Sequence, residues 1–205
     1  MLKEIGIMQG RLLPKFKGRY QAHPLGYWKD EFLIAKDLGL NYIEFILDYN
    51  DFEQNPLIFE SGINEIINII QTTNVGVKSI CADYFMEAPI HSSLINVYES
   101  SINILNNLIV NSNKIGVKDI VIPCVDQSSL MHEKDQINLI KNLQKPIELA
   151  SKYNINLALE TDLPPKNLAS LLGEFDSNIM TVNYDTGNSA SLGYDMLEEF
   201  KCYGE

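Results

Sequence analysis

The hydrophobic residues of this chain recur in one repeated arrangement: an amphipathic segment, a short turn with Gly or Asn, and a dense β-branched run. The four clearest copies are residues 36–47, 71–81, 113–123 and 151–160. In each copy Gly or Asn follows the last helical turn, where a left-handed backbone conformation is favoured. The pattern therefore predicts helices that alternate with strands.

Two further apolar runs, at 5–10 and 180–185, bring the expected strands to six. Strands that alternate with helices pair in parallel through right-handed crossovers. Helices are expected at 29–38 and at 92–115, the second capped by Ser92 or Ser93. Because no linker-like or low-complexity segment divides the chain, we expect a single domain over 1–205.

The expected helix faces follow from the same periodicity. For the first helix the apolar face is Phe32, Leu33, Ala35 and Leu38. For the second it is Ile95, Ile102, Leu105, Leu108 and Ile109.

An open doubly wound sheet and a barrel both fit alternating strands and helices. The open sheet usually carries a glycine-rich turn after its first strand, but residues 9–18 have neither GxGxxG nor GxxxxGK[ST] spacing. Polar residues instead follow many strand ends, as in barrel enzymes. They are Gln9, Arg11, Glu44, Asp83, Glu160, Asp162, Asp185 and Asn188. The fold class expected is α/β, a TIM barrel of (β/α)8 type with about six βα units present.

Charge and composition narrow the function classes. The net charge of −11 disfavours a nucleic-acid surface, which needs clustered Lys and Arg. No apolar run approaches the roughly 18 to 20 residues of a membrane span, and residues 1–5 do not resemble a signal peptide. Three cysteines without a CxxC pair argue against a disulfide framework or a structural zinc site. We expect a cytoplasmic protein with neither nucleic-acid nor membrane partners.

Two acidic residues stand out, because each ends a run that reads as a buried strand. Glu160 closes the run from Asn156, and Asp185 closes the run from Met180. A carboxylate so placed needs a proton, a cation or a set of donors. A hard divalent ion would satisfy both, and so would a structural role in which each caps a turn or meets Lys or Arg. Spacing alone does not separate these readings, and Asn188 is open to both a substrate contact and a capping role.

The first loop carries four cations, Arg11, Lys15, Lys17 and Arg19, which either hold an anionic sugar or phosphate or are solvated. The three histidines, His23, His91 and His132, are expected in loops. Among them, His91 is the best candidate for a ligand, because the loop after the third strand opens toward the same rim.

Five segments together resemble a known family. They are 6–14, 35–44, 81–85, 159–165 and Asn183-Tyr-Asp-Thr-Gly-Asn-Ser-Ala190, and they extend over the whole chain. They are similar to sugar-phosphate isomerases and epimerases of the xylose isomerase-like TIM-barrel superfamily. The resemblance implies a (β/α)8 barrel that holds one divalent ion (manganese, cobalt, zinc or magnesium) and acts on a small sugar or sugar phosphate.

The family's ligands on its fifth and sixth strands correspond to Glu160 and Asp185. By this resemblance Glu160 is also the catalytic residue, which transfers a proton next to a carbonyl through an enediolate. Gln9, Arg11, Glu44, Asp83, Asp162 and Asn188 are then the candidates for substrate binding.

The chain also departs from the family, since no residues supply a seventh and an eighth strand, which carry the family's His and second Glu. Three explanations are open: a fragment that is inactive alone, completion by another chain as in a homo-oligomer, or a member that has lost activity. Two other functions are a non-catalytic incomplete barrel that binds a sugar or a partner subunit, and an AP endonuclease-like hydrolase. The second of these needs a His-rich zinc cluster and a basic rim.

Overall fold

Six parallel strands form one sheet in the order β1 to β6 in the computed structural model, which describes residues 4–204. The strands are β1 (Gly6–Met8), β2 (Tyr42–Ile46), β3 (Gly76–Cys81), β4 (Asp119–Cys124), β5 (Asn156–Thr161) and β6 (Met180–Val182). Each strand pairs with the next along the chain, for example Cys124 with Thr161 across β4 and β5. This sequential parallel order is the one that the alternating pattern predicts for a barrel.

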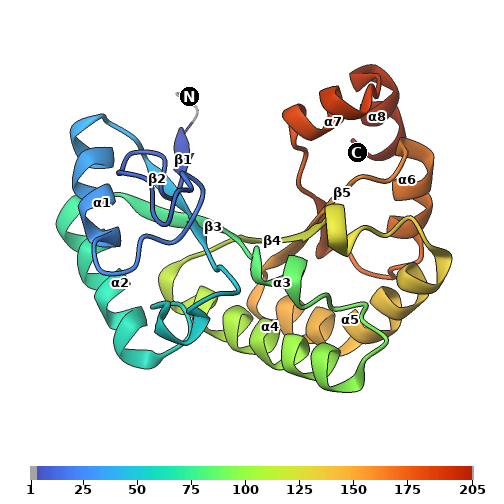
Figure 1. The fold of residues 1–205 in the computed structure, drawn as a ribbon, viewed down its shortest axis with the longest axis horizontal. Helices are drawn as coiled ribbons and strands as arrows, with labels where there is room; N and C mark the ends of the chain where they lie inside the picture. The colour runs from blue at the N-terminus through green and yellow to red at the C-terminus, as the bar shows by residue number, and fades with distance from the viewer. Residues whose placement is uncertain (1–3, 205) are drawn as a thin grey trace.

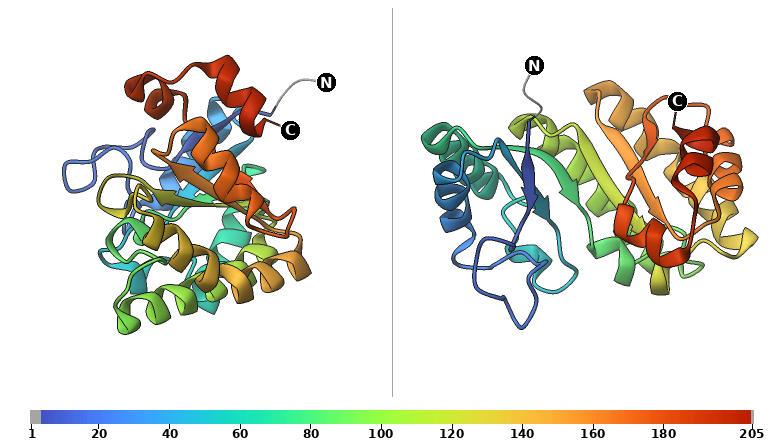
Figure 2. Two further views of the ribbon diagram at one scale, coloured as in Figure 1. Left: turned by 90° about the vertical axis from the view of Figure 1, so that its right-hand side faces the viewer. Right: turned by 90° about the horizontal axis from the view of Figure 1, so that it is seen from above.

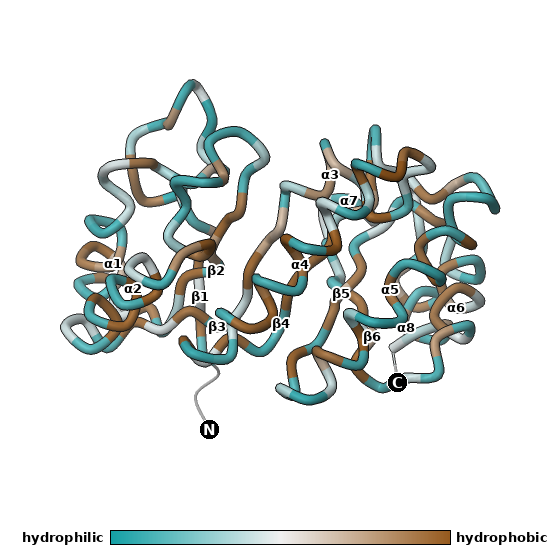
Figure 3. The backbone as a smooth tube through the Cα atoms, turned by 90° about the horizontal axis from the view of Figure 1, so that it is seen from below, coloured by the Kyte–Doolittle hydropathy of each residue, from teal (hydrophilic) through white to brown (hydrophobic). Residues whose placement is uncertain are grey.

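The helices cover one face of this curved sheet, and the other face stays open (Figures 1 and 2). They are α1 (Trp28–Asp37), α2 (Glu60–Thr73), α4 (Ile95–Ile115), α5 (Glu133–Tyr153) and α6 (Pro165–Gly173). Shorter elements follow the strand ends: η1 (Phe52–Gln54), α3 (Tyr84–Glu87), η2 (Asp126–Ser128), α7 (Thr186–Leu192) and α8 (Met196–Tyr203). Hydrophobic and hydrophilic segments alternate along the helices in Figure 3, as expected for helices that bury one side.

Most of the core lies between these helices and the outer face of the sheet. A smaller apolar cluster lies on the inner face, where Ile46, Cys81, Val121 and Ala158 are buried and Met8 packs against them. Each of the first five strands therefore contributes one residue to an inner layer, as in barrel interiors. Since side chains alternate along a strand, residues two positions away in the same strand also face inward.

Two expected element boundaries are wrong. Helix α4 begins at Ile95 after Leu94, whose side chain cannot cap it, and the Ser92 hydroxyl instead accepts a bond from the backbone N–H of Leu94 at 3.2 Å. Strand β6 ends at Val182, so Asp185 lies beyond the strand, at the start of α7.

The expected apolar face of α1 is also wrong in part, because Leu33 and Leu38 are exposed. The buried positions are Trp28, Glu31, Phe32 and Ala35. In α4, Leu105, Leu108 and Ile109 are buried as expected, whereas Ile95 is exposed.

A long loop, residues 9–27, joins β1 to α1 and is anchored by one buried carboxylate. Glu31 of α1 accepts hydrogen bonds from the backbone N–H groups of Gly10, at 2.8 Å, and Leu12, at 3.1 Å. These bonds satisfy loop donors that would otherwise be buried without partners. They fix the start of the loop beside the open end of the sheet.

Candidate active site

A cavity of about 450 Å³ opens at the carboxyl ends of the strands. Its polar lining comes from Gln21, Glu44, Asp83, Asp126, Glu160, Asn183, Asp185 and Asn188. The inner-layer residues Met8 and Cys81 also line it, so the apolar layer lies next to the cavity. In a parallel barrel this end of the sheet is where catalytic residues gather.

Glu160 lies near the end of β5 with its side chain on the inner face, between two amides. Its Oε2 accepts a hydrogen bond from Nδ2 of Asn183 at 2.7 Å, and its Oε1 accepts one from Nδ2 of Asn188 at 2.8 Å. Burial raises the pKa of Glu160 to about 6; the charges of Asp185, Asp83 and Glu44 act in the same direction, while the Asn183 bond opposes them. A carboxyl group with this pKa can both take up and release a proton near neutral pH.

Asp185 caps helix α7 and also borders the cavity. Its Oδ1 accepts a hydrogen bond from the backbone N–H of Asn188 at 2.8 Å. This bond is the capping arrangement expected at a helix start. One oxygen of Asp185 therefore has the capping role that the sequence left open. The capping bond also places Asn188, whose side chain then reaches Glu160.

The opposite wall of the cavity carries two more carboxyl groups. Glu44 of β2 accepts a hydrogen bond from the hydroxyl of Ser79, and Asp83 accepts one from the Cys81 thiol at 3.1 Å. Burial raises the pKa of Glu44, and nearby Asp83 and Asp119 add to the rise. Burial also raises the pKa of Asp83, although the Cys81 bond and the positive charge of Arg19 oppose the rise. The cavity is thus a concentration of negative charge that a cation or a proton would stabilise.

The ligand set for a metal ion is only partly present. Glu160 and Asp185 are hard oxygen donors next to one cavity, and the charge of Asp185 already raises the pKa of Glu160. Within residues 4–204 there is no group of three or more His, Cys, Asp or Glu side chains arranged to hold an ion. The two carboxylates suit a hard ion such as Mg²⁺ or Mn²⁺, which keeps several water ligands.

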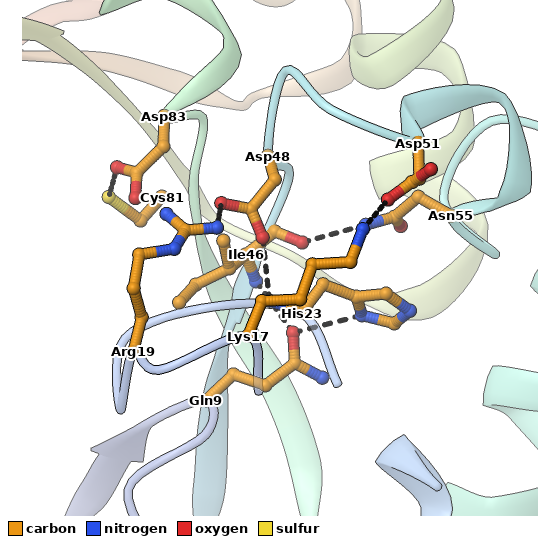
Figure 4. Close-up of polar contacts among 10 residues, drawn as sticks. All are labelled: Gln9, Lys17, Arg19, His23, Ile46, Asp48, Asp51, Asn55, Cys81 and Asp83. Atoms are coloured by element: carbon orange, nitrogen blue, oxygen red, sulfur yellow. Dashed lines mark hydrogen bonds and ion pairs between the residues drawn. The ribbon is translucent and has the colours of Figure 1, made fainter. Parts of the chain in front are cut away.

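Five of the expected site residues meet around this cavity: Glu44, Asp83, Glu160, Asp185 and Asn188. The other three, Gln9, Arg11 and Asp162, do not line the cavity. Their role in substrate binding stays a prediction. The side chain of Gln9 is fully buried beneath the loop, where its Oε1 accepts a bond from the backbone N–H of Ile46 at 3.0 Å (Figure 4).

Arg11 is exposed and donates to Oε1 of Gln21 at 3.2 Å, so it reaches the cavity only through another residue. The Oδ1 of Asp162 accepts a hydrogen bond from the Ser129 hydroxyl at 2.8 Å, and the Asp162 backbone carbonyl accepts one from Tyr194 at 2.8 Å. Asp162 therefore holds neighbouring loops together.

Of the polar lining residues named above, the sequence reasoning missed Gln21, Asp126 and Asn183. Asn183 directly follows β6 and is in step with inward-facing residues, since Thr181 pairs with Ala158 of the inner layer. The strand-end rule that selects Glu160 would also select Asn183. Gln21 lies in the long first loop, where no periodicity signals its direction.

The histidines lie outside regular elements, as expected. His91 is buried, but it does not line the cavity, and its backbone carbonyl accepts a bond from Asn138 of α5 at 3.1 Å. His23 is also buried and contacts Gln9 (Figure 4). In the part of the chain that the structure describes, no helix is long and apolar enough to cross a membrane.

The sequence is similar to proteins named as sugar epimerases. A family model described as a xylose isomerase-like TIM barrel matches residues 32–205. A probable L-ribulose-5-phosphate 3-epimerase, UlaE of Mycoplasma pneumoniae, is 27% identical over 135 residues, which are 65% of this chain and 44% of that protein. The UlaE epimerase of Escherichia coli O1:K1 is 24% identical over 190 residues, 89% of this chain and 67% of that protein. The matches thus span under half of the first relative and about two thirds of the second.

Solved structures share the fold at low sequence identity. The apo 3-keto-D-glucoside 4-epimerase YcjR from E. coli aligns with a TM-score of 0.73 and 13% identity over 97% of this chain and 74% of that one. A xylose isomerase-like TIM-barrel protein from Mycobacterium smegmatis in complex with magnesium aligns with a TM-score of 0.70 and 16% identity, over 98% of this chain and 71% of that one. The IOLI protein with a bound zinc atom aligns with a TM-score of 0.64 and 15% identity, over 83% of this chain and 61% of that one. Two of these three structures therefore hold a divalent metal.

Proposed function

The chain belongs to the xylose isomerase-like TIM-barrel family, and we propose from this premise that its cavity moves a proton beside the carbonyl of a ketose or ketose phosphate. The observation that carries the proposal is the state of Glu160: a half-buried carboxyl group, fixed by two amides, with its pKa raised to about 6. An acid–base catalyst works best when its pKa is near the pH at which it acts.

The reaction class is epimerisation or isomerisation through an enediolate. The Glu160 carboxylate removes the proton from the carbon next to the carbonyl, and the electron pair of the broken C–H bond moves toward the carbonyl oxygen. A proton from solvent water on the opposite face of that carbon inverts its configuration. Alternatively, Glu160 returns its proton to the former carbonyl carbon while the hydroxyl proton of the first carbon passes to the former carbonyl oxygen, and this shifts the carbonyl. The first step is assigned to Glu160 because its pKa is raised to about 6, whereas Glu44, Asp83 and Asp185 accept bonds from Ser79, Cys81 and a helix start.

Asn183 and Asn188 position this carboxylate rather than react themselves. Each donates one N–H to a different Glu160 oxygen, so the plane of the carboxylate is fixed relative to the cavity. Each oxygen keeps a further acceptor position for a substrate proton or a cation.

Glu160 and Asp185 would hold the divalent ion of this site. The ion would polarise the substrate carbonyl and stabilise the negative charge that develops on its oxygen. Four carboxyl groups gather at this cavity, and this arrangement supports the assignment: Glu160, Asp185, Asp83 and Glu44. Burial and the repulsion from the other three raise the pKa of Glu160, and a bound cation would relieve this repulsion.

The substrates to test follow from the similar proteins, which are named as L-ribulose-5-phosphate 3-epimerases. L-Ribulose 5-phosphate and free L-ribulose are each incubated with the protein and Mn²⁺ in D₂O, and deuterium at carbon 3 is followed by NMR. We expect Glu160→Gln to lower incorporation by at least 100-fold, because general acid–base catalysis contributes about that much or more.

Glu148→Gln is the matched control, since Glu148 is exposed on α5 away from the cavity, and it should keep the wild-type rate. Equal incorporation by wild type and Glu160→Gln would remove Glu160 from the mechanism. A wild-type protein that binds ketose without exchange would instead be a non-catalytic sugar binder.

A further inference from the structure

A second cavity lies next to the candidate active site, and the proposed reaction makes no use of it. It measures about 380 Å³ and lies between the loop after β1 and the loop after β2, with lining residues in 16–25 and 48–55. The side chains of Arg19 and Asp48 stand at the boundary (Figure 4). Their charges act on Asp83, which lines the active-site cavity. A ligand in one cavity would therefore lie close to the other.

The charged side chains of this loop cavity neutralise one another. Lys17 Nζ lies 2.6 Å from Asp51 Oδ2, and Arg19 Nη2 lies 2.8 Å from Asp48 Oδ1 (Figure 4). The other Asp48 oxygen accepts a hydrogen bond from the backbone N–H of His23 at 2.8 Å. Two cations and two carboxylates leave no net charge for a free anion to meet.

His23 presents a hydrogen-bond acceptor, as its contacts show. The backbone N–H of Ile46 can only donate, so the Gln9 atom 3.0 Å from it is the amide oxygen. The same oxygen lies 3.2 Å from Nδ1 of His23, so Nδ1 carries the proton. In the neutral ring Nε2 then has a bare lone pair. Burial lowers the pKa of His23 to about 4, which keeps the ring neutral at physiological pH.

This acceptor has no partner among the residues that the structure describes. His23 is 5% exposed, and its Nε2 is buried without a hydrogen bond within 4–204. In Figure 4 this nitrogen is on the side of the ring away from Gln9. His23 itself lines the loop cavity. A buried polar atom without a partner is costly, so a ligand that donates a hydrogen bond to it would gain the bond and remove the cost.

We propose that the loop cavity binds an uncharged, hydroxyl-bearing part of a carbohydrate, with one ligand hydroxyl donating to Nε2 of His23. This inference rests on the proposed function and adds to it the kind of group that the neighbouring subsite recognises. A hydroxyl can donate to His23 and accept from Lys17 or Arg19 in the same cavity. The volume of about 380 Å³ is within the range of small-ligand sites.

A phosphate group fits this cavity poorly. The phosphate dianion has acceptor oxygens only, so its lone pairs would repel the lone pair on Nε2 of His23. Lys17 and Arg19 are already paired with Asp51 and Asp48, so the cavity offers the dianion no net positive charge. If the substrate is phosphorylated, its phosphate lies elsewhere, and the loop cavity takes the hydroxylated end.

Trp28 offers a direct measurement, because it is the only tryptophan in the sequence and its ring centroid lies 6.2 Å from that of His23. Wild-type protein is titrated with L-ribulose and, separately, with inorganic phosphate, while Trp28 fluorescence is followed. We expect a saturable change with L-ribulose and none with phosphate. His23→Phe keeps an aromatic ring beside Phe45 and Trp28 but lacks the acceptor, and we expect about tenfold weaker binding, as for one lost hydrogen bond.

His132→Phe is the matched control, since His132 is exposed and does not line this cavity, and its affinity should be unchanged. If His23→Phe does not fold, the ¹⁵N signals of the histidine rings in the wild-type protein replace it. The signal of an unprotonated Nε2 should shift when L-ribulose binds. Saturation by phosphate, or an Nε2 signal that L-ribulose leaves unchanged, would overturn the proposal.

The two proposals fail separately. A saturable Trp28 response without deuterium exchange supports the loop cavity and contradicts the proposed reaction. Deuterium exchange without any Trp28 response or Nε2 shift supports the proposed reaction and contradicts ligand binding in the loop cavity. The partner of Nε2 would then be a water molecule.

Discussion

The alternation of side chains between the two faces of a strand explains which residues the sequence alone could assign to the site. Met8, Ile46, Cys81, Val121 and Ala158 form the inner layer, and Glu160 is two positions from Ala158, on the same face. Glu44 stands in the same relation to Ile46. A polar residue at a strand end therefore faces the cavity when its position is in step with the inner layer.

The failures have separate causes. Gln9 directly follows the inner-layer residue Met8, so its side chain points the other way and is buried. Asp162 is in step with Glu160, but its side chain accepts a bond from the Ser129 hydroxyl and does not line the cavity. Gln21 reaches the cavity from a long loop whose path depends on contacts distant in sequence, such as the ion pair of Arg19 with Asp48. No local pattern encodes such a path.

The raised pKa of Glu160 predicts a pH-dependent stability. The pKa is about 6 in the folded protein and 4.5 in the unfolded chain, so the folded state binds more protons between these values. The free energy of unfolding should therefore fall as pH rises from about 4.5 to 6, by about 1 to 2 kcal/mol from this group.

Urea unfolding at pH 5 and pH 7 measures this effect in wild type and Glu160→Gln. The variant should lose less stability than wild type between the two pH values. Glu44, Asp83 and Glu31 have pKa values raised in the same direction, so some loss should remain in both proteins. An identical loss in both proteins would mean that Glu160 titrates as an ordinary carboxyl group.

At the scale of single elements, periodicity locates the helices better than it locates their ends or faces. The expected ranges 29–38 and 92–115 both contain helices, because the apolar spacing matches the helical repeat. The face of α1 was misjudged because Glu31 is buried, and a charged residue on a buried face breaks the hydrophobic pattern. Its partners, the N–H groups of Gly10 and Leu12, belong to a distant loop and are not apparent from the sequence of the helix.

Glu31 should therefore be important for the loop that precedes α1. In Glu31→Gln the amide NH₂ would face one of the two backbone N–H donors, which leaves a buried donor without a partner. We expect a loss of about 1 to 3 kcal/mol in the free energy of unfolding. Hydrogen exchange at Gly10 and Leu12 should become faster.

Asp30→Asn is the control, since Asp30 is the exposed neighbour of Glu31 on the same helix, and it should change stability little. If Glu31→Gln and Asp30→Asn have the same stability and the same exchange rates, Glu31 does not anchor the loop.

At the scale of the whole molecule, the sequential order of the six strands follows from the chain pattern. A doubly wound sheet reverses its strand order at a switch point and places a glycine-rich turn there. This sequence has no such turn, and the six strands of residues 4–204 show no reversal. The two cavities are less predictable. The loop cavity depends on how the loops after β1 and β2 pack together, through pairs such as Lys17–Asp51 that are far apart in sequence. The active-site cavity depends on the path of the loop that brings Gln21 to it.

The carboxyl groups at the strand ends also make the stability of the whole molecule sensitive to a divalent ion. An ion that binds the folded state alone raises the free energy of unfolding by about 2.7 kcal/mol at 100 times its dissociation constant. We expect Mn²⁺ to raise the melting temperature progressively with concentration, because it would relieve the repulsion around Glu160 and Asp185. Asp185→Asn can still cap α7 through its side-chain oxygen, so it should keep its fold and lose most of this effect.

The net charge of −11 makes a control for unspecific binding necessary. Melting curves are therefore compared at matched ionic strength with Na⁺, and Glu148→Gln removes a carboxylate from the exposed surface of α5. A specific site requires that Glu148→Gln respond to Mn²⁺ like wild type while Asp185→Asn and Glu160→Gln do not. If all four proteins gain the same stability, the ion binds the acidic surface as a whole, and the pair at the strand ends is not a metal site.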